Sequence, residues 1–165
     1  MIRSFALSTL VAFAVAGAAA AQESHGHDDD HHVSELGGIR AVHAWTRSTD
    51  GDTALIFADI ENRSAQTVVL TGGESALAED VRLVGFQMTD GEPHYVALPE
   101  MPIGAGKEIL LEPEGLALQL TGVKQALREG TEIEVELEFD TGHMDVHVEV
   151  GRADATRHSH AGHAH

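Results

Sequence analysis

Apolar and polar residues alternate along much of the chain between residues 39 and 150. The clearest example is residues 131–140 (TEIEVELEFD), where glutamates alternate with Ile, Val, Leu and Phe. A period of two predicts a β-strand with one buried face and one solvated face. Similar runs, separated by turn residues, occupy residues 39–48, 54–62, 66–71, 81–88, 94–98, 108–111, 116–120 and 143–150. Many short strands with turns between them predict an all-β fold, an antiparallel β-sandwich.

The two ends of the chain lack this pattern. Residues 1–21 combine Arg3, an apolar stretch and a final run of small residues, which is typical of a secretory signal peptide. The apolar stretch is too short to predict a transmembrane anchor, so we expect no stable insertion into a membrane. Residues 22–38 have few apolar side chains. We therefore expect a signal peptide (1–21), a disordered His- and Asp-rich segment (22–38), a folded domain (39–150) and a disordered His-rich tail (151–165), in a protein exported to the periplasm.

Acidic residues dominate the charge of the chain. It carries 27 Asp and Glu against 10 Lys and Arg, a formal net charge of −17 at pH 7. This disfavours nucleic acid and anionic membranes as partners and favours cations, although an acidic surface also simply keeps an exported protein soluble. The absence of cysteine excludes disulfides and thiolate metal sites. No GxSxG, HExxH or phosphate-binding glycine motif is present, and we therefore expect no enzyme.

Histidines gather in the two end segments. These are His25, His27, His31, His32, His158, His160, His163 and His165. Neutral imidazoles in a flexible segment can wrap a borderline ion such as Cu(II), Zn(II) or Ni(II). An expression tag is the alternative interpretation of the C-terminal group, but a similar group at the other end argues against it. The composition predicts affinity for a metal ion, with copper or zinc as the candidates.

The last predicted strand, residues 143–150 (HMDVHVEV), offers candidate ligands inside the domain. Alternation places His143, Asp145, His147 and Glu149 on one outer face. His143 and His147 are four residues apart, roughly 13 Å along a strand, so each would need a further donor from another segment to hold an ion. A merely polar outer face is the alternative.

His43 is a candidate for that further donor. The first and last strands of such sandwiches often lie side by side, which would bring His43 towards His143 or His147. Simple alternation, however, places His43 on the same face as Ile39 and Trp45, which faces the core. A β-bulge would be needed to turn it outward, and a hydrogen-bonded, half-buried histidine is the alternative.

His94, Met88 and Met101 form a third candidate group. One imidazole and two thioethers would suit Cu(I). Methionine is often only core filler, and alternation places His94 and Tyr95 on opposite faces of their strand.

Three motifs in the second half of the chain resemble the PCuAC family of periplasmic copper chaperones. They are residues 101–106 (MPIGAG), 111–115 (LEPEG) and 122–130 (GVKQALREG), which correspond to the family's IPAGG-like turn, LxPGG and GLKQPLKEGD. The resemblance implies a cupredoxin-like sandwich over residues 39–150. It also implies Cu(I) binding by a His, a Met and a His-x-Met pair, and delivery of copper towards cytochrome oxidase assembly.

The residues at the family's ligand positions do not fit that copper site. The correspondence places Val84, Tyr95, Ala117 and Gln119 there. Cu(I) prefers thioether and imidazole donors, and none of these side chains supplies one. The chain is therefore identified as a divergent member of PCuAC type that lacks the usual Cu(I) ligands.

Three functions remain open. The first is a periplasmic metal-binding protein of the copper-chaperone type. It would bind copper, as Cu(I) or Cu(II), through its tails and a non-standard site on the sandwich, and hand it to a partner such as an oxidase assembly factor or a transporter. The second is a buffer or scavenger of Zn(II) or Cu(II) that feeds a metal-uptake system, because imidazole and carboxylate suit these ions. The third is a metal-free interaction module on the same fold.

Overall fold

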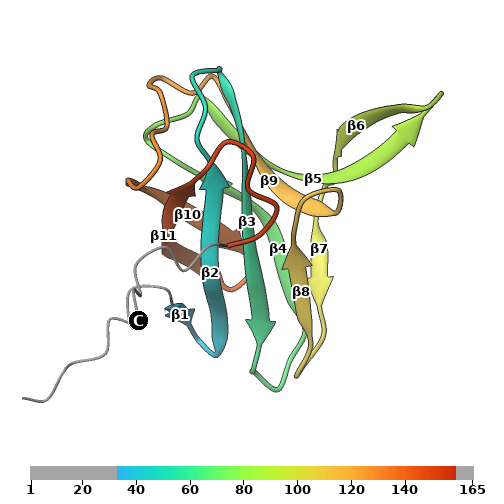
Figure 1. The fold of residues 1–165 in the computed structure, drawn as a ribbon. Coiled ribbons are helices and arrows are strands. Elements are labelled where there is room, and N and C mark those ends of the chain that lie inside the picture. Colours follow the sequence, from blue (N-terminus) through green and yellow to red (C-terminus); the bar gives the residue numbers. More distant parts are fainter. Residues whose placement is uncertain (1–32, 159–165) are drawn as a thin grey trace, which may run out of the picture.

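Eleven β-strands and no helix make up residues 33–158, the part of the chain that the computed structural model describes (Figure 1). The strands are β1 (Val33–Leu36), β2 (Ile39–Arg47), β3 (Thr53–Asn62), β4 (Val68–Glu74), β5 (Asp80–Thr89), β6 (Glu92–Ala97), β7 (Met101–Ile103), β8 (Glu108–Leu111), β9 (Leu116–Thr121), β10 (Glu132–Phe139) and β11 (Gly142–Gly151). The described residues contain no helix that is long and apolar enough to cross a membrane. The predicted all-β class is confirmed.

The strands form one mixed sheet that curls back on itself. Its order is β6-β5-β9-β8-β3-β2-β11-β10-β4-β7, β1 adds to β2, and further pairings join β4 to β5 and β3 to β9. These further pairings close the path into a flattened barrel, the predicted β-sandwich (Figure 1). Among the described strands, pairing is antiparallel except for β2 with β11 and β8 with β9.

The strands with the clearest sequence alternation form as predicted. In β10 and β11 the apolar side chains are buried, and the polar ones between them stay on the outer face. The two strands pair along their length, from Glu132 opposite Glu149 to Phe139 opposite Gly142. The parallel pairing of β2 with β11 also confirms that the first and last predicted strands lie side by side.

Strands β1 and β7 have no clear sequence alternation and were not expected. β1 pairs with β2 through a turn at Gly37 and Gly38, both of which have positive φ. Leu36 also packs against the core. This corrects the expected boundary, because residues 33–38 belong to the folded part and not to a disordered segment. β7 pairs with β4 and buries Ile103.

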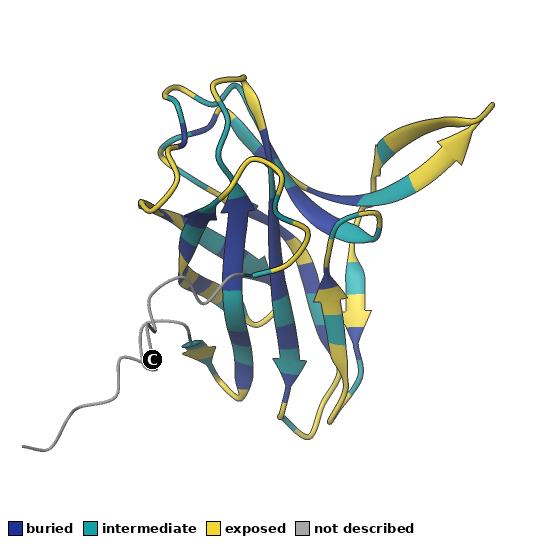
Figure 2. Ribbon diagram, viewed as in Figure 1, coloured by how far each residue is buried: buried dark blue, intermediate teal, exposed yellow. Residues whose placement is uncertain are grey.

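Aliphatic side chains fill the interior of the sandwich. Ile56 and Ile60 of β3, Leu70 of β4 and Leu118 of β9 have almost no exposed surface. Figure 2 shows buried positions along the central strands, whereas the far part of the β5–β6 hairpin projects from the sandwich and is exposed. Removal of this apolar surface from water is the main source of stability in such a fold.

A buried asparagine joins β3 to β7 at one end of the sandwich. The Nδ2 of Asn62 donates to the carbonyls of Gln66 at 2.7 Å and Ile103 at 2.8 Å, and the side chain is almost completely buried. Its Oδ1 accepts hydrogen bonds from the backbone N–H and the hydroxyl of Ser64. All polar atoms of this amide therefore have partners, as a buried polar group requires.

Replacing Asn62 with Ala should lower the free energy of unfolding by about 2–4 kcal/mol, because several buried polar groups lose their partner. Urea unfolding followed by the fluorescence of Trp45, the only tryptophan, measures this. Ser64→Ala removes one hydroxyl and should cost less than about 1 kcal/mol. Equal losses in the two variants would show that Asn62 does not hold this connection together.

Candidate functional site

A bulge in β2 decides which of its side chains reach the outer face of the sheet. The register with β3 shifts between Val42 and Trp45, and His43 has a φ of 53°. An extra residue of this kind reverses the alternation beyond it. Ala41 faces the main core before the bulge and Ala44 does so after it, whereas Trp45 belongs to a separate cluster. The bulge that was needed to turn His43 away from the core is present.

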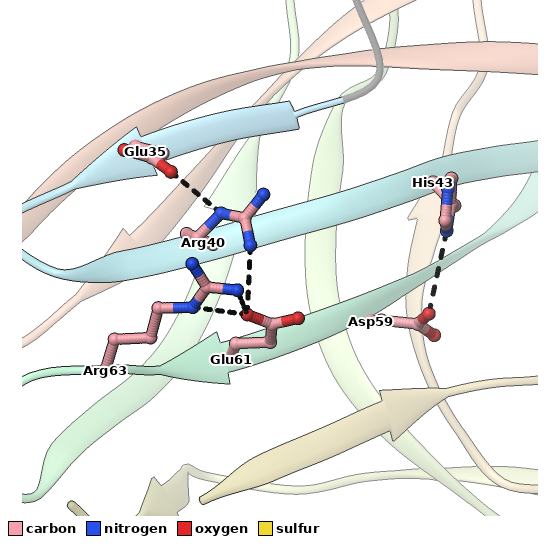
Figure 3. A network of polar contacts seen from close by, with 6 residues as sticks. All are labelled: Glu35, Arg40, His43, Asp59, Glu61 and Arg63. Carbon is pink, nitrogen blue, oxygen red and sulfur yellow. Dashed lines mark hydrogen bonds and ion pairs between the residues drawn. The ribbon is translucent and has the colours of Figure 1, made fainter. Parts of the chain in front are cut away.

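His43 lies next to a carboxylate of the neighbouring strand. Its Nδ1 is 3.8 Å from an oxygen of Asp59 on β3, and both side chains are about half exposed. Figure 3 shows the two facing each other, further along the strands from the Arg40–Glu61 pair. A separation of 3.8 Å is too long for a hydrogen bond, so the contact is electrostatic and depends on protonation of the imidazole.

The chain returns across this face after β11 ends. The backbone N–H of Ser48 donates to the carbonyl of Gly151 at 2.9 Å. Arg47 Nε donates to the carbonyl of Ala155 at 2.7 Å, and Ala155 packs against the cluster that contains Trp45. Residues 151–158 of the expected tail are therefore packed against the domain.

A local hydrogen bond lies within this returning segment. Arg152 Nε donates to Asp154 at 3.0 Å, and the N–H of Ala155 donates to the carbonyl of Arg152 at 3.1 Å. The side-chain hydrogen bond lowers the pKa of Asp154 and raises the pKa of Arg152. Both groups are fully exposed, so solvent screens the pair and it contributes little to stability.

The returning segment brings a second imidazole to His43. His158 stacks on His43 with ring centroids 5.3 Å apart and an interplanar angle of 27°. Its Nε2 is 3.0 Å from a carboxylate oxygen of Glu149, and the imidazole is only 10% exposed. Glu149 itself lies opposite Trp45 in the parallel pair of β2 and β11. Two imidazoles and two carboxylates from β2, β3, β11 and the returning segment therefore gather on one face.

We call these four residues, His43, Asp59, Glu149 and His158, the His43–His158 cluster. Its imidazole nitrogens and carboxylate oxygens are donors that suit borderline divalent ions such as Cu(II) and Zn(II). Within residues 33–158, no three His, Asp or Glu side chains already stand close enough together to hold an ion. The cluster therefore offers paired donors rather than a finished coordination sphere.

The predicted candidates on β11 occupy its outer face. His143 and His147 are exposed, and Met144, Val146 and Val148 between and beside them are buried. His143 Nδ1 is 3.4 Å from a carboxylate oxygen of Glu136 on β10. The β11 residue that belongs to the His43–His158 cluster is Glu149, which the sequence argument had assigned only to the shared outer face.

The structure does not bring together the group of His94, Met88 and Met101. On the β5–β6 hairpin, His94 pairs with Gln87 while Met88 pairs with Pro93, so His94 and Met88 lie on opposite faces. Met88 is 60% exposed. Met101 lies on β7, which pairs with β4 at the other end of the sheet path.

Two of the positions that correspond to Cu(I) ligands lie in a buried apolar cluster. Val84 of β5 and Ala117 of β9 are cross-strand neighbours, and both are buried with Trp45 and Phe57. The Trp45 and Phe57 rings are 4.7 Å apart between centroids. We call this group the Trp45 cluster (Trp45, Phe57, Val84 and Ala117).

The other two positions border a cavity beside the Trp45 cluster. Tyr95 and Gln119 line it together with Arg47 and Phe57, and its volume is about 400 Å³. Tyr95 also packs against the Trp45 cluster and accepts a hydrogen bond from the backbone N–H of Glu114 at 3.1 Å. The four aligned positions therefore lie together, as the ligands of one ion would, but they carry no thioether or imidazole.

Some candidates lie outside the described residues, namely His25, His27, His31, His32, His160, His163 and His165. The contact between His43 and His158 was missed by the sequence argument, which paired His43 with β11. The sequence carries no periodic signal for this contact, because it depends on the bulge in β2 and on the path of the chain after β11.

The chain is similar to known proteins both in sequence and in fold. The LpqE-like lipoprotein family matches residues 39–150, and no curated protein matches the chain. The apo PCuAC domain of PmoF1 is similar with a TM-score of 0.64 and 18% identity, covering 73% of this chain and 99% of that one. The copper-bound PCuAC domain of PmoF2 has a TM-score of 0.62 and 18% identity, covering 73% and 98%. The Cu(I) form of DR1885 from Deinococcus radiodurans has a TM-score of 0.55 and 20% identity, covering 69% and 80%. These similarities confirm the fold implied by the sequence motifs.

Val84→Ala and Gln119→Ala should leave the affinity for copper unchanged, because neither native side chain is a ligand for Cu(I). Competition with a chromophoric chelator, under reducing and then oxidising conditions, measures the affinity for Cu(I) and Cu(II). Val84→Ala should still lower the free energy of unfolding by about 1–2 kcal/mol, since it removes buried methyl groups. A marked loss of affinity in either variant would place copper at the Trp45 cluster after all.

Proposed function

Because the chain belongs to the LpqE-like family and has the fold of PCuAC domains, we propose that it is an exported metal-binding protein of the copper-chaperone type. Copper is its cargo, which it binds through imidazole nitrogens and hands to a partner protein. Two of the similar structures, the PmoF2 domain and DR1885, are copper-bound forms. Their shared fold supports copper as the cargo of this chain.

The observation that carries the proposal is the meeting of His43 and His158 on the outer face of β2. A tail histidine is held against the domain, 10% exposed, beside a second imidazole and two carboxylates. A histidine that served only to solubilise a tail would have no reason to be buried there. Imidazole and carboxylate donors favour Cu(II) over Cu(I), so the expected cargo is the oxidised ion.

The tails enlarge the capacity of this protein for metal. His160, His163 and His165 follow His158 closely in the sequence, and four further histidines precede β1. The formal net charge of −17 attracts cations to the whole molecule. We expect the tails to supply most of the total capacity.

The proposed location is the periplasm, in agreement with the signal-like residues 1–21 and with a family of exported lipoproteins. The 165 residues contain no cysteine to which a lipid could be attached. The partner is a metal-receiving protein of the same compartment or its membrane, such as an oxidase assembly factor or a transporter. Neither nucleic acid binding nor catalysis forms part of the proposed role.

A buffer or scavenger of Zn(II) is the second candidate function. The same observation favours it, because imidazoles paired with carboxylates also suit Zn(II). In that role the protein would supply a metal-uptake system. Direct competition between Cu(II) and Zn(II) for the mature chain decides between the two.

Replacing the seven histidines outside the described residues with Asn should remove most of the bound copper, since these residues provide most of the imidazoles. Metal content after desalting, with calorimetric titration of the mature wild-type chain as reference, measures the loss. The wild-type chain should bind Cu(II) with submicromolar affinity. If it binds neither Cu(II), Cu(I) nor Zn(II), the metal-free interaction module is the correct description.

A further inference from the structure

We propose that the His43–His158 cluster is a binding site for a single borderline divalent ion, Cu(II) or Zn(II), which closes when the returning C-terminal segment docks on β2. The inference rests on the proposed function, since it assumes that the protein takes up metal. The proposed site differs from the Cu(I) positions implied by the PCuAC resemblance. It also differs from the histidines of the tails outside residues 33–158.

The distance between the two rings matches that of two imidazoles on one ion, but their stacked orientation does not. With metal–nitrogen bonds of about 2 Å, two imidazoles on one tetrahedral ion have ring centres roughly 5 Å apart. The rings of His43 and His158 are 5.3 Å apart between centroids. Binding one ion therefore requires the rings to rotate out of the stack about their side-chain bonds, so that one nitrogen of each ring points to the ion.

Each imidazole also has a carboxylate beside it. Asp59 faces Nδ1 of His43 at 3.8 Å, and Glu149 is 3.0 Å from Nε2 of His158. A metal-binding histidine usually donates its second ring N–H to a carboxylate, which orients the ring and increases its basicity. In this arrangement the ion is held by Nε2 of His43 and Nδ1 of His158, with water completing the coordination sphere. The two carboxylates are thus positioning residues.

The backbone at His43 sets the direction of this side chain. A φ of 53° lies in the left-handed region, which His, Asn and Asp adopt more often than most other residues with a Cβ. The bulge at this position directs the imidazole away from the core. Its partner His158 is 10% exposed although it lies near the chain end. Both side chains are therefore close to each other before any ion arrives, and only rotation of the rings is needed to bind it.

The two imidazoles and two carboxylates of this site come from four separate segments, β2, β3, β11 and the residues after β11. Only the folded chain with its C-terminal segment in place contains all of them. The hydrogen bond from Arg47 to the carbonyl of Ala155 holds that segment against β2. An ion bridging His43 and His158 would in turn fix the segment over the Trp45 cluster, against which Ala155 packs.

Titration of the mature chain (residues 22–165) with Cu(II) tests the site. Trp45 is the only tryptophan and lies opposite Glu149, so paramagnetic Cu(II) bound at the cluster should quench its fluorescence at short range. We expect the first equivalent of Cu(II) to quench Trp45 in the wild-type chain. His43→Asn keeps a residue that tolerates positive φ in the bulge and should abolish this first phase, as should His158→Asn.

Two further variants test the carboxylates, and one serves as the control. Asp59→Asn and Glu149→Gln should weaken the first phase by roughly 10–100-fold, the usual effect of removing a carboxylate behind a metal-binding histidine. His94→Asn removes one imidazole from the exposed face of β6 and should titrate like the wild-type chain. Combining His43→Asn with His158→Asn should add nothing to either single change, because both act on one ion.

The possible outcomes distinguish failure of the proposed site from failure of the proposed function. Loss of the first phase in His43→Asn, with the total copper content of that variant nearly unchanged, supports the site. If Cu(II) quenches Trp45 in His43→Asn as it does in the wild-type chain, the proposed site is wrong. The proposed function then depends on the histidines of the tails. If the wild-type chain takes up neither Cu(II) nor Zn(II), the proposed function fails and the site fails with it.

Discussion

The phase of side-chain alternation in β2 is the constraint on which the rest of the outer face depends. A strand that pairs with β1, β3 and β11 can present each residue to only one face, and one extra residue at His43 reverses the order. Without the bulge, Trp45 would point into the aliphatic interior and His43 with it. With the bulge, both side chains lie on the opposite face of β2, where Trp45 packs in the Trp45 cluster and His43 contacts Asp59 and His158.

Trp45 in turn determines the surroundings of Val84 and Ala117, two of the positions that correspond to Cu(I) ligands in the PCuAC motifs. Trp45 and Phe57 bury large rings against Val84 and Ala117, so apolar contact joins β2, β3, β5 and β9 on this side. An imidazole at position 84 or 117 would have to share this space with two aromatic rings. On this face the sandwich therefore has a second, smaller hydrophobic core. This core also provides the surface against which the C-terminal segment packs, through Ala155.

Sequence could predict those features that follow from a repeated pattern. The alternation in β10 and β11 and the three motifs between residues 101 and 130 were sufficient for the fold and for the convergence of positions 84, 95, 117 and 119. The orientation of His43 could not be predicted, because a bulge is a local choice made by pairing with β3 and leaves no periodic trace. The contact with His158 joins residues far apart in the chain and depends on a main-chain carbonyl, that of Ala155, whose position no side-chain pattern reveals. Short strands such as β7 form because a neighbour offers free hydrogen-bonding groups, and their own residues show little preference.

The two ends of the sheet path have a consequence for how the molecule behaves among its copies. Strands β6 and β7, which terminate the path, each contain a proline, Pro93 and Pro102. A proline has no N–H to donate, so an incoming strand would meet an interrupted ladder at either edge. Charged residues such as Glu92 add electrostatic repulsion between acidic copies. Both ends of the sheet path are thereby poor templates for the strand-by-strand addition of further copies.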